Sequence, residues 1–181
     1  MAVADRVRTE SAAAIAALKR LGISRVVLLS GDNRRTAEIV GEETGVDEVH
    51  AELLPEDKVR VVTEIETEFG PTAMVGDGVN DAPALARASM GVAMGAAGTD
   101  AAIETADVAL MGDDLGKLPW LIEHSRATLT VIRANAILAL GIKAVFVLLT
   151  FSGMASLWGA IVADMGASLL VVANAMRLLR R

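Results

Sequence analysis

The sequence predicts two unlike parts: an α/β domain on a mainly parallel sheet, followed by an α-helical hairpin long enough to cross a membrane. Short strands alternate with helices in the first part, which is typical of parallel sheets covered on both faces. Charge is concentrated there too. Residues 1–133 carry 13 Lys and Arg against 22 Asp and Glu, whereas residues 134–181 carry 4 against 1. The first part is therefore acidic and water-soluble, and the second is nearly uncharged.

Composition excludes several classes of function. The chain contains no cysteine, so it has no disulfide framework, no thiolate zinc site and no cysteine nucleophile. Its formal net charge of −6 argues against a nucleic-acid partner, because nucleic-acid binding depends on neutralising phosphates with Lys and Arg.

Hydrophobic patterning and turn residues predict the order of elements in the first part. An Ala-rich helix ends at Gly22, as helices often do at glycine. Glu64, Glu66 and Glu68 are expected on a solvated helix face. The expected helices are 11–21, 34–43, 55–68 and 82–88, and the expected strands are 25–29, 72–75, 91–93 and 108–110.

Two expected strands end in loops that bear aspartate. Strand 72–75 runs into Gly76-Asp77-Gly78-Val79-Asn80-Asp81, which brings two carboxylates together on a tight turn. Magnesium prefers such oxygen ligands and usually retains waters while bridging to a phosphate. Strand 25–29 runs into Ser30-Gly31-Asp32, whose hydroxyl and backbone amides suit phosphate oxygens.

Lys58 adds a point charge suited to a phosphorylated group, at the start of the helix that Pro55 opens. Together with the two loops it indicates phosphoryl transfer, in which positioning and charge neutralisation supply most of the catalysis. The sequence has no Gly-x-x-x-x-Gly-Lys-Ser/Thr loop, so a P-loop enzyme is not predicted.

The second part contains two apolar runs separated by a Ser-Gly break. At about 1.5 Å per residue, 135–151 would span about 25 Å and 155–176 about 33 Å, against a hydrocarbon core of about 30 Å. Arginines flank the hairpin at both ends, so the positive-inside rule places both ends of the chain in the cytoplasm. These arginines are Arg126, Arg133, Arg177, Arg180 and Arg181.

Lys143 and Asp164 are the only formally charged residues between 134 and 176. Both lie about ten residues from the turn, so we expect similar depths near the bilayer midplane, where they could face one another. An ionisable group at that depth costs about 2.5–3.5 kcal/mol, which makes it a functional-site hypothesis. The alternative is an ion pair that only orients the helices.

The ordered motifs resemble the phosphorylation domain of P-type ATPases. They are Ser30-Gly31-Asp32-Asn33, then Pro55-Glu56-Asp57-Lys58, then Met74 to Leu85 with its Gly-Asp-Gly-Val-Asn-Asp core. The resemblance implies a haloacid-dehalogenase-like, Rossmann-like fold and covers essentially the whole chain. It implies that Asp77 and Asp81 bind magnesium, that Asn80 holds their loop, and that Lys58 contacts the phosphoryl group. It also implies that Ser30, Gly31 and Asp32 line the phosphate site.

The hairpin resembles the last two helices of heavy-metal transporters in that superfamily. Lys143 and the segment Ala163-Asp164-Met165-Gly166-Ala167 look like the zinc, cadmium and lead export subgroup. The resemblance implies that Asp164 is a ligand of the transported ion, with Lys143 as its counter-charge. Met165, which is next to Asp164 in the sequence, is a candidate minor ligand. A carboxylate also favours a borderline divalent ion such as zinc over monovalent copper.

The sequence departs from the family in what it lacks. No Asp-Lys-Thr-Gly-Thr occurs, so the aspartate that accepts phosphate and the strand that carries it are missing, as are an ATP-binding domain and a Cys-Pro-Cys. We therefore expect the C-terminal portion of an ATP-driven pump in the plasma membrane, inactive without its N-terminal portion. Two alternatives are a membrane-anchored haloacid-dehalogenase-like phosphatase, with Asp5 as its sole candidate nucleophile, and a non-catalytic fragment that regulates a pump.

The expected organisation has three segments. Residues 1–118 would form the C-terminal part of the phosphorylation domain, residues 119–133 a connecting helix, and residues 134–181 the transmembrane hairpin in the lipid bilayer.

Overall fold

The computed structural model describes residues 9–78, 80–95, 104–153 and 156–180, which fall into two compact units. The first unit extends to Trp120 and holds all the strands that the structure describes, whereas the described part of the second, from Leu121, consists of helices. Asp5, Val79, Ala155 and Arg181, which contribute to the predictions from sequence, lie outside the described residues.

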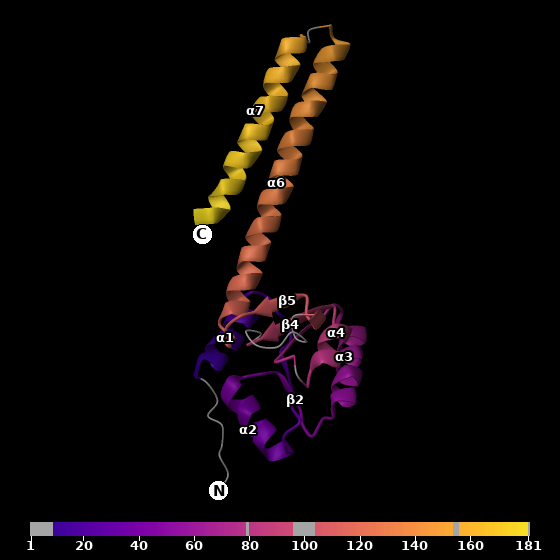
Figure 1. The fold of residues 1–181 in the computed structure, drawn as a ribbon, viewed down its shortest axis with the longest axis vertical. Coiled ribbons are helices and arrows are strands. Elements are labelled where there is room, and N and C mark those ends of the chain that lie inside the picture. Colours follow the sequence, from indigo (N-terminus) through magenta and orange to yellow (C-terminus); the bar gives the residue numbers. More distant parts are fainter. Residues whose placement is uncertain (1–8, 79, 96–103, 154–155, 181) are drawn as a thin grey trace. The chain divides into compact units, whose positions relative to one another are not determined.

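Strands and helices alternate in the first unit, as predicted (Figure 1). The helices are α1 (Thr9–Arg20), α2 (Arg34–Thr44), α3 (Pro55–Phe69) and α4 (Ala82–Arg87). The strands are β1 (Val27–Leu29), β2 (Glu48–His50), β3 (Ala73–Gly76), β4 (Met90–Met94) and β5 (Val108–Leu110). Strand β2 was not predicted, because a three-residue Glu-Val-His segment carries no clear strand pattern.

All strand pairs in the described residues are parallel, and they form two sheets. In one sheet β1 pairs with β2, so that Leu28 lies opposite Val49. In the other, the order is β3-β4-β5, with Val75 opposite Val92 and Val92 opposite Val108. The carboxyl ends of parallel strands meet at one edge, which is where such folds place their sites.

The core of the first unit lies beneath α3 and α4. Val62, Met74, Ala84 and Leu85 form a buried cluster, against which Leu29 of β1 also packs. A side chain of β1 and a side chain of β3 therefore reach the same apolar cluster, although their strands belong to different sheets.

Two glycines lie where neighbouring elements pack too closely for a side chain. A Cβ on Gly41 of α2 would lie 2.4 Å from a methyl group of Val49, so the glycine lets α2 approach β2. A Cβ on Gly91 of β4 would lie 2.7 Å from the carbonyl oxygen of Leu85, which is backbone and cannot rotate away. Larger residues at these positions would force the elements apart.

The second unit contains two antiparallel apolar helices lying side by side (Figure 1). Helix α6 (Lys117–Phe151) is continuous over 35 residues, and α7 (Leu157–Ala175) is followed by a 3₁₀ turn, η1 (Met176–Arg180). Both helices are long and apolar enough to cross a membrane. The hydroxyl of Ser156 accepts a hydrogen bond from the Gly159 amide and caps α7.

We predict that Gly91→Ala destabilises the first unit by about 1–3 kcal/mol, because the added methyl group must displace the Leu85 carbonyl. The measurement is amide hydrogen exchange of β4 and α4 in the whole chain, where the variant should lose protection. Gly112→Ala is the control, since its Cβ would meet only the flexible end of Lys117 at 3.2 Å. Equal protection in both variants would contradict the packing argument.

Candidate functional site

Ser30 begins the loop at the end of β1 and organises it through its hydroxyl. The Ser30 amide donates to the His50 carbonyl at 2.9 Å, which extends the pairing of β1 with β2. The Ser30 hydroxyl accepts from the Asp32 amide at 3.1 Å and lies 3.2 Å from the Asp32 carboxylate. Asn33 then caps α2 by accepting from the Thr36 amide at 3.0 Å. The predicted phosphate loop is thus a turn that leads into a helix N-terminus.

The segment before α3 lies along this loop and connects it to Lys58. The Leu53 amide donates to the Ser30 carbonyl at 3.1 Å, and the Glu52 amide donates to the Asp32 carbonyl at 2.9 Å. Glu52 has a φ of 59°, which is unusual for a residue with a side chain. This backbone conformation turns the chain from β2 toward Pro55, where α3 begins.

Asp57 stabilises the first turn of α3. Its carboxylate accepts from Arg60 at 2.9 Å and from the Leu54 amide at 3.1 Å. These two contacts, with Arg60 the stronger, hold the pKa of Asp57 below its usual value. Through Leu54 on one side and Arg60 on the other, Asp57 therefore stabilises the helical turn that carries Lys58.

Lys58 reaches across to the loop that follows β3. Its ammonium lies 2.5 Å from the Asp81 carboxylate, and the two side chains are only 13% and 15% exposed. A Cβ on Gly76 would lie 2.6 Å from the other carboxylate oxygen of Asp81, so the absence of a side chain at the end of β3 makes room for Asp81. The structure therefore brings together two residues that the sequence singled out separately.

Asp77 and Asn80 lie on the same loop with exposed side chains. In the described parts of the chain, no group of three or more His, Cys, Asp or Glu is arranged to hold a metal ion. Magnesium needs less than that, because it is commonly bound by one or two carboxylates, with waters and a substrate phosphate completing its shell. The donor set of Asp77 and Asp81 fits this pattern.

A network around Glu66 was missed by the sequence analysis, which expected a solvated side chain. The Glu66 carboxylate accepts from the amide and the hydroxyl of Ser89, each at 2.6 Å, and pairs with Arg87 at 3.0 Å. The Ser89 hydroxyl is the largest cause that lowers the pKa of Glu66. Glu66 thus ties α3 to the segment between α4 and β4. No local pattern distinguishes it from its exposed neighbours.

We predict that Glu66→Gln increases hydrogen exchange in residues 87–91 several-fold at neutral pH, because it removes the charge that Arg87 and Ser89 stabilise. A carboxyl with a lowered pKa stabilises the fold above its usual pKa, and the effect is lost as pH falls through the lowered value. Wild type and variant should therefore converge in acid. Glu68→Gln, which changes an exposed neighbour, should match wild type throughout.

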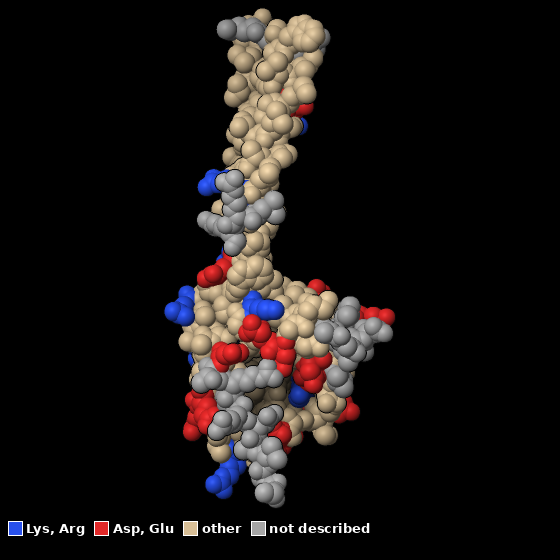
Figure 2. Space-filling view, turned by 60° about the vertical axis from the view of Figure 1, so that its left-hand side comes forward, with Lys and Arg blue, Asp and Glu red and all other residues tan. Residues whose placement is uncertain are grey.

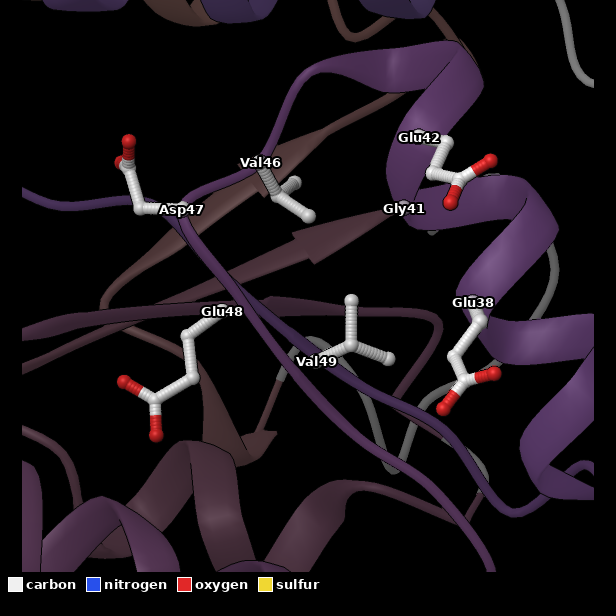
Figure 3. Close-up of a pocket in the computed structure, with 7 residues that line it drawn as sticks. All are labelled: Glu38, Gly41, Glu42, Val46, Asp47, Glu48 and Val49. Carbon is white, nitrogen blue, oxygen red and sulfur yellow. The ribbon is translucent and has the colours of Figure 1, made fainter.

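A hollow of about 250 Å³ lies elsewhere, between α2 and β2 (Figure 3). Four carboxylates surround it, but those from the β2 side already have partners. Asp47 pairs with Lys19 at 2.5 Å, which lowers the pKa of Asp47, and Glu48 pairs with Arg25 at 2.8 Å. None of the residues selected from the sequence lines this hollow, and we assign it no role.

The charged residues of the hairpin are both exposed. Lys143 lies on α6 and Asp164 on α7, and the structure shows no hydrogen bond or ion pair between them. Met165 is 65% exposed. Figure 2 shows that the surface of these helices is otherwise mostly uncharged, in contrast to the acidic first unit. These residues lie in the second unit and form a separate candidate site.

Comparison with known proteins gives consistent similarities along the chain. Residues 1–89 match the family model of haloacid dehalogenase-like hydrolases. The chain is 53% identical over 180 residues to a probable cadmium-transporting ATPase of Listeria monocytogenes, covering 99% of this chain and 25% of that protein. It is 51% identical over 181 residues to a zinc/cadmium/lead-transporting P-type ATPase of Escherichia coli strain K12, covering 100% of this chain and 24% of that protein.

The structure of this chain is also similar to a solved structure. The crystal structure of a zinc-transporting PIB-type ATPase in its E2.Pi state superposes with a TM-score of 0.88 and 50% identity, covering 97% of this chain and 28% of that one. The chain therefore spans about a quarter of the length of the relatives that it matches.

Proposed function

Because the chain is homologous to the C-terminal portion of zinc- and cadmium-transporting P-type ATPases, we propose that it contributes two sites to such a pump. One is the magnesium- and phosphate-binding edge of the phosphorylation domain, and the other is part of the membrane site for the transported ion. The resemblance and the haloacid-dehalogenase-like fold expected from the motifs are confirmed. The roles of individual residues remain proposals that combine this resemblance with the contacts of the residues themselves.

The observation that supports the cytoplasmic site is the ion pair of Lys58 and Asp81. In the proposal, the amides and side chains of Ser30, Gly31 and Asp32 receive phosphate oxygens, and the Lys58 ammonium contacts the phosphoryl group. Asp77 and Asp81 hold magnesium, and Asn80 supports their loop. When bound, magnesium would neutralise charge on the phosphoryl oxygens. Lys58 keeps the Asp81 carboxylate oriented before any ligand arrives.

We predict that changing the carboxylates of this site and changing Lys58 have opposite effects on divalent-cation binding. Asp77→Asn and Asp81→Asn should weaken binding of Mn²⁺, used as a magnesium substitute, by about tenfold each, because each removes an anionic ligand. Lys58→Met should strengthen binding, because it removes a competing positive charge. Electron paramagnetic resonance of free Mn²⁺ measures the affinity in the whole chain.

Glu68→Gln, a change of an exposed carboxylate on α3, is the matched control for these variants and should leave Mn²⁺ affinity unchanged. Hydrogen exchange of β3 and α4 checks that each variant is folded, since removing one member of a shielded ion pair is destabilising. If Lys58→Met weakens Mn²⁺ binding in a folded chain, the proposed division of roles is wrong.

In the membrane, we assign Asp164 as a ligand of the transported divalent ion, Lys143 as its counter-charge and Met165 as an additional ligand. The carboxylate favours zinc, cadmium or lead over monovalent copper. The pump would lie in the plasma membrane with both ends of this chain in the cytoplasm, in agreement with the arginines that flank the hairpin. Phosphate acceptor and ATP would come from the rest of the pump, so we expect this chain alone to be inactive.

We predict that a chimera retains zinc and cadmium export when this chain replaces the matching portion of the Escherichia coli relative. Asp164→Ala in the chimera should abolish metal resistance of exporter-deficient cells, and Lys143→Ala should reduce it strongly, because both charges are costly in a bilayer and need a function. Met165→Leu should reduce metal resistance less than Asp164→Ala does. Met176→Leu is its matched control. Full resistance with Asp164→Ala would contradict the assignment.

The two alternative functions give different results. A phosphatase would release phosphate from a small phosphoester without any other protein, and a regulatory fragment would change the activity of an intact pump added to it. Neither is expected of this chain.

A further inference from the structure

Two amide side chains join the helices of the hairpin. The Asn174 side-chain nitrogen donates to the Asn135 side-chain oxygen at 2.8 Å, and the Asn135 nitrogen donates to the Val171 carbonyl at 3.4 Å. Both asparagines are half-buried between α6 and α7. Among the hydrogen bonds described for the hairpin, these connect the two helices, whereas those of Thr150 and Ser168 stay within one helix.

The hairpin has a second contact nearer its turn. A Cβ on Gly159 would lie 3.8 Å from the Phe146 ring, so the ring packs at this glycine. Lys143 lies between Asn135 and Phe146 on α6, and Asp164 lies between Gly159 and Asn174 on α7. Contacts on both sides therefore fix the relative register at which the two charged residues occur.

This register places the charges at nearly the same depth. Lys143 is eight residues from Asn135 and Asp164 is ten residues from Asn174. At about 1.5 Å per residue, these separations are about 12 and 15 Å in the same direction, a difference of about 3 Å. The sequence predicted similar depth from distances to the turn alone, and the asparagine contact supports it independently.

The same register fixes the direction in which the charges point. An α-helix rotates by about 100° per residue, so Lys143 is offset by about 80° around α6 from Asn135, and Asp164 by about 80° around α7 from Asn174. Because the helices are antiparallel, these two offsets have opposite senses when both helices are viewed from the same end of the hairpin. Since the asparagines face each other, both deviations lead to the same side of the hairpin. The two residues are therefore neighbours on one face, consistent with the exposure of both side chains.

We propose that Asn135 and Asn174 form an amide clamp that positions Lys143 and Asp164 side by side on this face of the hairpin. They are positioning residues, and they contact neither the charges nor the ion. The assignment of the face to a transported ion rests on the proposed function, whereas the clamp itself rests only on the register. Without it, the turn and the Phe146 contact hold one end of the hairpin and the other end is free to separate.

The free energy that the clamp contributes can be estimated from measured hydrogen bonds between membrane helices. Hydrogen bonds between transmembrane helices average about 0.6 kcal/mol, which corresponds to about a threefold change in an equilibrium. We therefore expect loss of one of the two bonds to raise the population of separated hairpins about threefold and loss of both about eightfold, without unfolding either helix. This change is sufficient to alter a geometry and too small to abolish insertion.

The chain lacks cysteine, so spin labels can be attached at chosen positions. One labelled pair is Lys143→Cys with Asp164→Cys, in phosphatidylcholine nanodiscs. A second pair near the turn, Val147→Cys with Trp158→Cys, serves as the internal reference. Pulsed electron resonance measures both distance distributions in the whole chain, with and without Asn135→Leu or Asn174→Leu. Circular dichroism measures the helix content of each variant.

Either leucine variant should broaden the 143/164 distribution toward longer distances and leave the 147/158 distribution and helix content unchanged. Asn174→Gln, which keeps an amide donor, should restore most of the original distribution. Ser168→Ala is the matched control, because Ser168 donates only to the Asp164 carbonyl of its own helix. An unchanged 143/164 distribution, or equal broadening of both pairs, would overturn the clamp. If the distances respond as expected while Asp164→Ala does not affect metal resistance, the clamp holds and the pump assignment fails.

Discussion

The candidate site of the first unit depends on one interaction, the shielded ion pair between Lys58 and Asp81. It joins the first turn of α3 to the loop that follows β3, so the rest of α3 and all of β3 lie between the two residues in the sequence. Breaking such a pair leaves one charge without compensation in a poorly hydrated place, which costs several kcal/mol. The pair therefore constrains the first turn of α3 and the loop after β3 at once. Gly76 leaves the space that the Asp81 side chain occupies.

Much of this site could be predicted from the sequence, because its parts are local. The strand ends, the Asp-Gly turns and the helix start at Pro55 are each encoded in a few consecutive residues, and parallel strands bring their carboxyl ends to one edge. Glu66 could not be predicted in the same way. Its partners, Ser89 and Arg87, lie more than twenty residues away and become neighbours only when α4 packs on α3. Strand β2 was missed because tertiary pairing with β1, not local propensity, makes it a strand.

The hairpin shows a similar division between local and non-local information. Run length and charge placement predicted two membrane spans and similar depths for Lys143 and Asp164. The side of the hairpin to which Lys143 and Asp164 point could not be predicted, because it depends on which faces of the two helices pack together. The hydrogen bond between Asn135 and Asn174 supplies that information, and from it we infer that the two exposed charges share one face. They remain accessible to a third element or an ion from the same side.

The chemistry of the clamp matters as much as its position. A Lys–Asp pair could join the helices more strongly, but it would add two formal charges to the hairpin. A charged clamp within about 15 Å of Lys143 and Asp164 would also alter the local field and offer a cation a competing carboxylate. Two amides satisfy each other without net charge, so they fix the register and leave Asp164 as the only formal anion between residues 134 and 176. In the first unit the contact between elements is itself charged, and the proposed phosphate site would use the same Lys58 charge.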